Sequence, residues 1–331
     1  MFKKIKNFIQ NYYKAILVYV LILCFFLINL PYYISAPGGL INTKDKINST
    51  FSMKGSLNMA YVSEIHATPA LLLYSFINDN WDVEKENDVK SDNETIKEME
   101  YRNKMLLEEA NDTALLVAYK NSNIDYKITN NKVYITYIDE KANTNLKIGD
   151  QILKIDEKNI DNKNTLFEYI ASKKIGDKVT IKVKDINGKN KVRKATLINV
   201  NNSPKVGAVI TQTFDIKSNK NIKFNFKKSE SGSSGGLMLT LTIYSNLNKI
   251  DLTNGKKVVG TGTIDEDGNV GEISGVKYKL IGAYKNKADI FLVPLENYKE
   301  AEKIKEKYNY DIDIVCVKTF EEALSYLKKL S

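Results

Sequence analysis

The pattern of apolar and polar positions changes along the chain and predicts several units of different structure. Residues 15–34 are almost continuously apolar, which predicts a helix about as long as a bilayer is thick. Residues 92–121 carry apolar side chains at helical spacing, which predicts a long amphipathic helix. Residues 122–201 alternate in short segments around one helical stretch, which is typical of a small β-rich unit. From 203 to 331 strand and helix patterns alternate, which predicts an α+β or α/β domain.

Composition excludes several classes of protein. The chain has 331 residues and a net charge of +9, but Arg102 and Arg193 are its only arginines. Nucleic-acid readout relies heavily on arginine, so we expect no nucleic-acid partner. The single histidine, His66, excludes a histidine-rich metal site and leaves one candidate base for a Ser-His or Cys-His mechanism. Cys24 and Cys316 are too few for a disulfide scaffold. We expect no metal and no cofactor.

The apolar segment 15–34 predicts a single membrane anchor. A basic tail, residues 1–14, precedes it and contains Lys3, Lys4, Lys6 and Lys14. The positive-inside rule therefore predicts a cytoplasmic N-terminus and an extracellular remainder from about Ala36 onward. The alternative is a cleaved signal peptide, since Ser35 and Ala36 are small, but Pro37 and the length of the segment favour retention as an anchor.

The β-rich unit contains a motif of a known peptide-binding domain. Residues 146–160 read LKIGDQILKIDEKNI and are followed by a short helix and the strand GDKVTIKV. This arrangement resembles a PDZ domain, which implies that an extended peptide adds to a strand beside that helix. The resemblance implies substrate-binding residues at Val133, Tyr134, Ile135, Leu166 and Ile170. The segment NNKVYITYI replaces the expected glycine-containing hydrophobic turn, so recognition of a C-terminus or of an internal strand both stay open, as does a purely structural role.

A serine- and glycine-rich run, residues 229–236, leads directly into an apolar helical segment. Read by composition alone it is a linker. Alternatively, glycines allow a tight turn onto a helix N-terminus, whose free N–H groups stabilise an oxyanion beside a serine. A serine nucleophile needs a base, and a lysine serves if apolar surroundings favour its neutral form. Periodicity does not distinguish Lys277 from Lys279 in the helix predicted at 276–286.

The C-terminal motifs then resemble the proteolytic domain of Lon-type serine peptidases. They are GSSGGLM at 232–238, VGTGT at 259–263 and ISGVKYK at 273–279. The resemblance implies Ser234 as nucleophile and Lys279 as base, with Thr261 orienting the lysine and Gly232 and Gly235 shaping the oxyanion loop. Ser233 stands where the family has proline and is the runner-up nucleophile.

The whole pattern resembles the membrane-anchored PDZ-Lon peptidases of Gram-positive bacteria. We expect a multidomain chain with a cytoplasmic tail (1–14), a transmembrane anchor (15–34), a mixed region ending in a long helix (37–121), a PDZ domain (122–201) and an α+β Lon-type proteolytic domain (203–331). The sequence has no G-x-x-x-x-G-K-[ST] motif, so no ATPase module is expected in it.

The predicted function is that of an extracytoplasmic, ATP-independent serine endopeptidase at the cell membrane. Its expected partners are secreted or membrane-anchored peptides and proteins, the lipid bilayer and, as the family implies, further copies of itself in a ring. The alternative is a catalytically silent PDZ adaptor or scaffold at the membrane surface.

Overall fold

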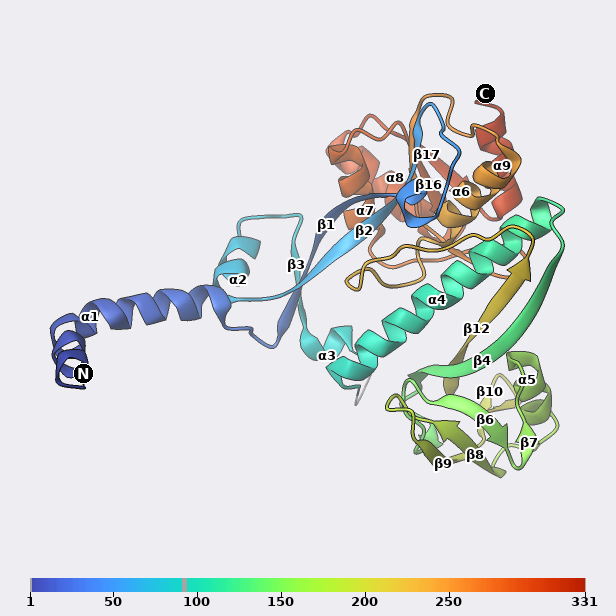
Figure 1. Ribbon diagram of the computed structural model, residues 1–331, viewed down its shortest axis with the longest axis horizontal. Coiled ribbons are helices and arrows are strands. Elements are labelled where there is room, and N and C mark those ends of the chain that lie inside the picture. Colours follow the sequence, from blue (N-terminus) through green and yellow to red (C-terminus); the bar gives the residue numbers. More distant parts are fainter. Residues whose placement is uncertain (1, 91–93, 331) are drawn as a thin grey trace. The chain divides into compact units, whose positions relative to one another are not determined.

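The computed structural model describes residues 2–90 and 94–330 (Figure 1). These residues form two compact units, one made of Met1–Gly38 and Val62–Val89, the other of Gly39–Tyr61 and Lys90–Ser331. The strands β1 (Tyr32–Asn42) and β2 (Ser56–His66) have residues in both units.

The first unit contains the apolar N-terminal helix α1 (Phe2–Leu27). The sequence predicted an anchor over 15–34, but the helix begins within the expected basic tail and ends at Leu27, and Tyr32 and Tyr33 are already in a strand. Pro31 excludes a helix through the predicted residues 31–34, because proline disfavours helical conformation at the preceding residue and has no N–H to donate. The first unit also holds α2 (Pro69–Ser75), β3 (Asp82–Lys85) and α3 (Glu86–Val89), and β3 pairs antiparallel with Tyr32–Ser35 of β1.

The second unit contains a parallel sheet that carries the C-terminal domain. β13 (Lys257–Gly260) lies between β2 and β16 (Ile290–Pro294), and β17 (Asp313–Val317) follows at the edge. The remaining elements of this domain are α6 (Gly236–Asn248), the short hairpin of β14 (Thr263–Ile264) and β15 (Val270–Gly271), α7 (Val276–Lys285), α8 (Leu295–Tyr308) and α9 (Phe320–Lys328). α6 is buried along nearly its whole length, because most of its side chains are apolar and the hydroxyls of Thr240 and Thr242 donate to carbonyl oxygens of the same helix.

Residues 37–121 were predicted as a separate region, and the structure corrects this. Ser56–Met59 of β2 pair in parallel with Lys257–Gly260 of β13, so this segment belongs to the sheet of the C-terminal domain. Between β1 and β2 lies the short 3₁₀ helix η1 (Thr43–Lys46). The long predicted helix is confirmed as α4 (Ile96–Asn121), which begins with a capping box at Thr95 and packs against α6.

A second sheet forms the PDZ-like part of this unit. Its strands run in the order β12-β4-β6-β8-β9-β5, with β7 paired to β6. These strands are β4 (Tyr126–Ile138), β5 (Asn143–Thr144), β6 (Gln151–Ile155), β7 (Lys158–Asn159), β8 (Lys178–Lys184), β9 (Asn190–Thr196) and β12 (Ala208–Ser218). The helix α5 (Lys163–Ala171) covers it, and a small hairpin of β10 (Ile198–Val200) and β11 (Ser203–Lys205) precedes β12.

The boundary predicted at 201–203 therefore differs from the structure. β12 pairs with β4 from Ala208 to Ser218, so the strand expected to open the proteolytic domain completes the PDZ-like sheet instead. Sequence alternation identified this strand but could not identify its partner.

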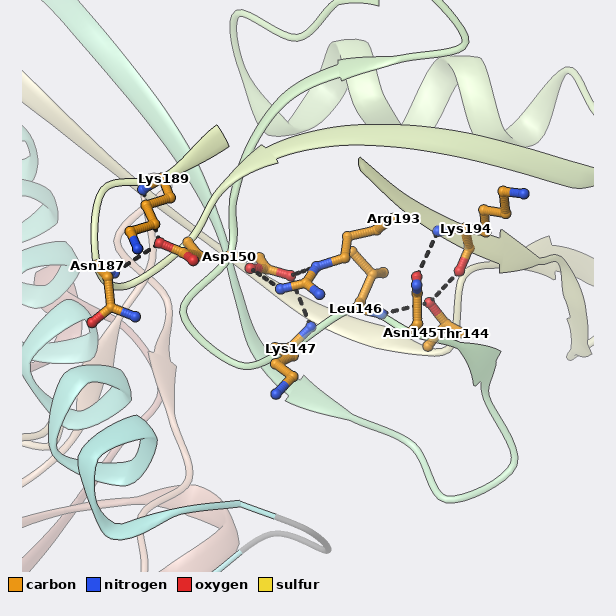
Figure 2. Close-up of polar contacts among 10 residues, drawn as sticks. Thr144, Asn145, Leu146, Lys147, Asp150, Asn187, Lys189, Arg193 and Lys194 are labelled. Atoms are coloured by element: carbon orange, nitrogen blue, oxygen red, sulfur yellow. Dashed lines mark hydrogen bonds and ion pairs between the residues drawn. The ribbon is translucent and has the colours of Figure 1, made fainter. Parts of the chain in front are cut away.

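The aspartate of the PDZ motif, Asp150, has a structural role, and Figure 2 shows its contacts. Asp150 is buried, and the Arg193 guanidinium donates to both of its carboxylate oxygens, with Nε at 2.8 Å and Nη2 at 3.1 Å. The backbone N–H of Lys147 donates to the same carboxylate at 2.9 Å. Gly149 adopts a φ of 85°, which a side chain would disfavour, and closes this turn. The aspartate thereby joins the turn before β6 to the strand β9.

Candidate active site

The serine-rich run forms a tight loop that enters α6. Gly235 caps the helix and Ser234 is half-buried beside it. A Cβ on Gly235 would lie 2.8 Å from Met59 Sδ, and one on Gly236 would lie 2.9 Å from the side chain of Ile264. Both positions therefore need glycine for close packing, so the run is part of the folded domain and the linker interpretation is wrong.

Main-chain bonds fix this loop to the end of β13. The Gly262 N–H donates to the Ser234 carbonyl oxygen at 2.8 Å, and the Leu237 N–H donates to the Gly262 carbonyl oxygen at 3.1 Å. The Gly232 N–H donates to the Asn103 carbonyl oxygen of α4 at 3.1 Å. Among the described residues, the N–H groups of Ser234 and Gly235 have no recorded acceptor. These two donors are thus available at the helix N-terminus, where the helix dipole favours negative charge.

Thr261 connects the serine loop to the predicted lysine. Its side chain is fully buried, and its hydroxyl donates to the Ser234 carbonyl oxygen at 3.2 Å. The Lys279 Nζ donates to the same hydroxyl at 3.2 Å. The three residues predicted from the motifs therefore meet at one place, although they come from a loop, from the end of β13 and from α7.

Lys279 occupies an unusual position for a lysine. Only 4% of its surface is exposed. It lies one turn into α7, between the fully buried Val276 and Ala283 of the same helix. Burial disfavours the ammonium form of an amine. Lys277, which the periodicity left as an alternative, is partly exposed, and its Nζ lies over the Tyr278 ring.

A cavity of about 300 Å³ borders the serine loop on the side of Ser233. It is lined mainly by residues of α4 and of the β14–β15 hairpin, together with Lys163 at the start of α5. Lys163 Nζ forms an ion pair of 2.8 Å with Glu266, which joins the PDZ-like part to this hairpin. The cavity therefore adjoins the serine loop, the hairpin after Thr261 and the PDZ-like helix.

Two carboxylates of α4 face the strand β12. Glu109 accepts from the Gln212 N–H at 3.2 Å, and Asp112 accepts from the Phe214 N–H at 2.9 Å. Burial raises the pKa of Glu109, and the hydrogen bond from Gln212 opposes this shift. Burial likewise raises the pKa of Asp112 to about 7, and the hydrogen bond from Phe214 again opposes it. Glu109 also lines the cavity beside Ser233.

Four of the five residues predicted to bind peptide lie in the PDZ-like core, and the fifth, Tyr134, is buried on the other face of β4 near Tyr101 of α4, so this part of the prediction needs correction. Val133, Tyr134, Ile135, Leu166 and Ile170 are all buried, none of them more than 7% exposed. The main chain at 133–134 is paired with β12 on one side and β6 on the other, which leaves no free edge for a peptide there.

A free edge beside α5 is found instead at β12, a strand that was predicted to belong to the other domain. Among the described strands β12 pairs with β4 alone, and it contacts α5. A signal was present in the sequence: the glycine-containing hydrophobic turn missing before β4 occurs as Val206-Gly207-Ala208 before β12. Gly207 has a φ of 76°, and a Cβ there would lie 2.6 Å from Ala142 Cβ.

Comparison with known proteins identifies the family of the domain that holds the parallel sheet, the serine loop and the buried lysine. Residues 142–329 match the model of the Lon protease (S16) C-terminal proteolytic domain. The match covers more than half of the chain, which therefore belongs to this family. Family membership supports a serine peptidase.

The similar proteins are longer than this chain. Lon protease 2 of Borreliella burgdorferi is 29% identical over 119 residues, which are 34% of this chain and 14% of that protein. Lon protease of Neorickettsia sennetsu is 33% identical over 98 residues, 30% of this chain and 12% of that protein. The chain thus matches about an eighth of the length of these relatives.

The structural neighbours are PDZ-like. The PDZ domain of an SdrC-like protein from Listeria monocytogenes is 28% identical, covering 25% of this chain and 92% of that one, with a TM-score of 0.23. The PDZ domain of the SdrC-like protein from Listeria innocua is 31% identical. The match covers 24% of this chain and 92% of that one, with a TM-score of 0.22.

The N-terminal helix meets the length and composition of a membrane span. Lys4–Leu27 has a mean hydropathy of 1.6, and none of its most apolar stretch is buried. Such a helix is either a membrane span or a signal sequence.

Proposed function

We propose that this protein is a membrane-anchored, extracytoplasmic serine endopeptidase that acts through Ser234 and Lys279 without ATP. The observation that carries the proposal is the buried Thr261 hydroxyl, which lies 3.2 Å from the Ser234 carbonyl oxygen and 3.2 Å from Lys279 Nζ. A structural lysine has little reason to be this buried beside a serine loop. A lysine that serves as a base needs such a position, because its neutral form must be populated.

In the proposed reaction, neutral Lys279 takes the proton from Ser234 Oγ as that oxygen attacks the peptide carbonyl carbon. The N–H groups of Ser234 and Gly235 stabilise the resulting oxyanion. The C–N bond then breaks, and protonated Lys279 gives its proton to the leaving amine. Water attacks the acyl ester with Lys279 again as base, which releases the new carboxylate and restores Ser234. Thr261 holds Lys279 in place as a positioning residue.

We further propose that the PDZ-like part presents extended peptides along β12. Support comes from its position at the edge of the sheet beside α5 and from the exposed side chain of Val209. Strand addition of this kind uses main-chain hydrogen bonds, so it tolerates varied sequences. The N–H groups of Gln212 and Phe214 are engaged by α4, so a peptide would reach the segment 208–211 first.

The proposed anchor and the proposed independence from ATP are supported by features of the sequence. The N-terminal half of α1 carries the lysines and its C-terminal half is apolar, which favours a span with its N-terminus in the cytoplasm. This sequence has no P-loop, so we propose that its substrates are already extended: secreted peptides, flexible loops or segments close to the membrane.

The test compares new protein N-termini at the cell surface and in the medium by mass spectrometry. The strains express wild type, Ser234→Ala, Lys279→Ala and Thr261→Val at matched levels. Two controls are available within the same elements: Lys277→Ala, a lysine of the same helix, and Ser233→Ala, the neighbouring hydroxyl.

We expect a set of cleavage products that Ser234→Ala and Lys279→Ala abolish and Lys277→Ala leaves intact. If Ser233→Ala abolishes the cleavage products and Ser234→Ala keeps them, the nucleophile is Ser233 and not Ser234. If both predicted variants give the wild-type products while deletion of the gene changes cell physiology, the protein is an adaptor and the peptidase proposal fails.

A further inference from the structure

The first unit exposes an apolar face on α2 and the turn after it. Leu73 is 58% exposed, Phe76 76% and Ile77 80%. Their spacing of three and four residues places them on one side of the helical turn. The segment 69–78 contains no charged residue. We call Leu73, Phe76 and Ile77 the α2 face.

An exposed face of this kind needs an explanation. Scattered apolar residues are normal on a protein surface, but a contiguous group marks a contact with another molecule or a membrane. The three side chains of the α2 face are too exposed to be packed against the rest of the first unit. Ser75, on the opposite side of the same helix, is buried.

The backbone places α2 next to the end of the proposed membrane span. The Leu30 N–H donates to the Ala67 carbonyl oxygen at 2.8 Å, and the Ala67 N–H donates to the Tyr32 carbonyl oxygen at 2.9 Å. Ala67 immediately precedes Thr68, the N-cap of α2. α2 also contacts α1, and Figure 1 shows it beside the C-terminal end of that helix. Within this unit, the α2 face is therefore close to the point where α1 leaves the bilayer.

The aromatic residues around α2 fit the boundary between lipid and water. The Tyr74 ring packs edge-on against the Trp81 ring, with centroids 4.8 Å apart. The Trp81 N–H donates to the Asn78 carbonyl oxygen at 2.9 Å and holds this tryptophan near the turn. Tyrosine and tryptophan are enriched at membrane interfaces, because one part of each side chain is apolar and another is polar.

We infer that the α2 face inserts into the interfacial layer of the same bilayer that α1 spans. α2 then forms a second, in-plane contact, as amphipathic interfacial helices do. This inference rests on the proposed anchoring by α1. A second contact beside the span restricts the tilt and rotation of the first unit, which a single transmembrane helix leaves free.

Trp81 gives a direct test, because it is the only tryptophan of the chain. The full-length protein is inserted into phosphatidylcholine vesicles, and Trp81 emission is recorded with lipids brominated either near the headgroup or near the end of the acyl chain. The variants are L73S/F76S/I77S and the control Phe167→Ser, an exposed apolar residue of α5. Circular dichroism checks that each variant keeps its helix content, and alkaline extraction checks that α1 is retained.

The expected result is that lipids brominated near the headgroup quench Trp81 in wild type and in Phe167→Ser, and that the triple variant loses this quenching. If the wild type resists alkaline extraction but neither brominated lipid quenches its Trp81 emission, the inference is wrong and the anchor stands. Extraction of the wild type from the vesicles would overturn the anchor and the inference together. If Trp81 emission changes with the protein-to-lipid ratio and is not quenched by brominated lipids, a second copy of the protein covers the α2 face. That result also overturns the inference.

Discussion

Asp112 makes the stability of the contact between α4 and β12 depend on pH. Its carboxylate lies against the Phe214 N–H at 2.9 Å. Burial is the main cause that raises the pKa of Asp112 from 3.8 to about 7, and the nearby carboxylates Glu108, Asp215 and Glu109 add to it. The folded protein thus keeps a proton on Asp112 at pH values where the unfolded chain has already lost it.

The sign and size of the effect follow from linkage. Where the folded state binds more protons, the free energy of unfolding falls as pH rises. For Asp112 this window extends from its ordinary pKa of 3.8 to about 7. At 1.36 kcal/mol for each pH unit, ionisation of Asp112 lowers the free energy of unfolding by about 4 kcal/mol across the window. The loss is absent below the window and constant above it.

Asp112→Asn removes the ionisation but keeps an oxygen that accepts from Phe214. We expect the variant to match wild type near pH 4 and to become more stable than wild type by up to about 4 kcal/mol near pH 7.5. Urea unfolding of the full-length protein in detergent at several pH values measures the difference. Asp125→Asn, an exposed carboxylate in the loop after α4, is the matched control. Parallel curves for Asp112→Asn and wild type across this range would refute the reasoning.

Three further substitutions test the site and its support. Thr261→Val removes the hydroxyl beside Lys279 Nζ, so we expect peptidase activity to fall about 100-fold while Thr261→Ser keeps most of it; equal activities in a peptide-cleavage assay would contradict this positioning role. Asp150→Ala leaves the guanidinium of Arg193 without its buried partner, so we expect the free energy of unfolding to fall by about 3 kcal/mol, and a thermal melt unchanged from wild type would disprove it. Gly235→Ala brings a methyl group within 2.8 Å of Met59 Sδ and should reduce activity by shifting the serine loop, whereas adding Met59→Ala should restore activity; a double variant no better than the single one would count against this packing.

The local sequence determined much of the candidate site. The resemblance of the motifs to Lon-type peptidases implied Ser234, Thr261 and Lys279, and the structure brings these three residues together. The sequence also predicted the long helix α4, whose capping box at Thr95 is a local signal. Local patterns suffice for a helix such as α4 because periodicity and caps depend on neighbouring residues alone.

Tertiary structure decided which strands pair and which edges stay open. The patterns at 132–138 and at 206–213 predict two strands equally well, but pairing covers β4 on both sides and leaves β12 at the edge of the sheet. For the same reason the predicted peptide-binding residues of β4 became core, and Ser56–Met59 joined a sheet formed by residues some 200 positions later. A period of two identifies a strand and its two faces. The partners of that strand depend on contacts between distant segments, whose burial must outweigh the entropy of closing the loops between them.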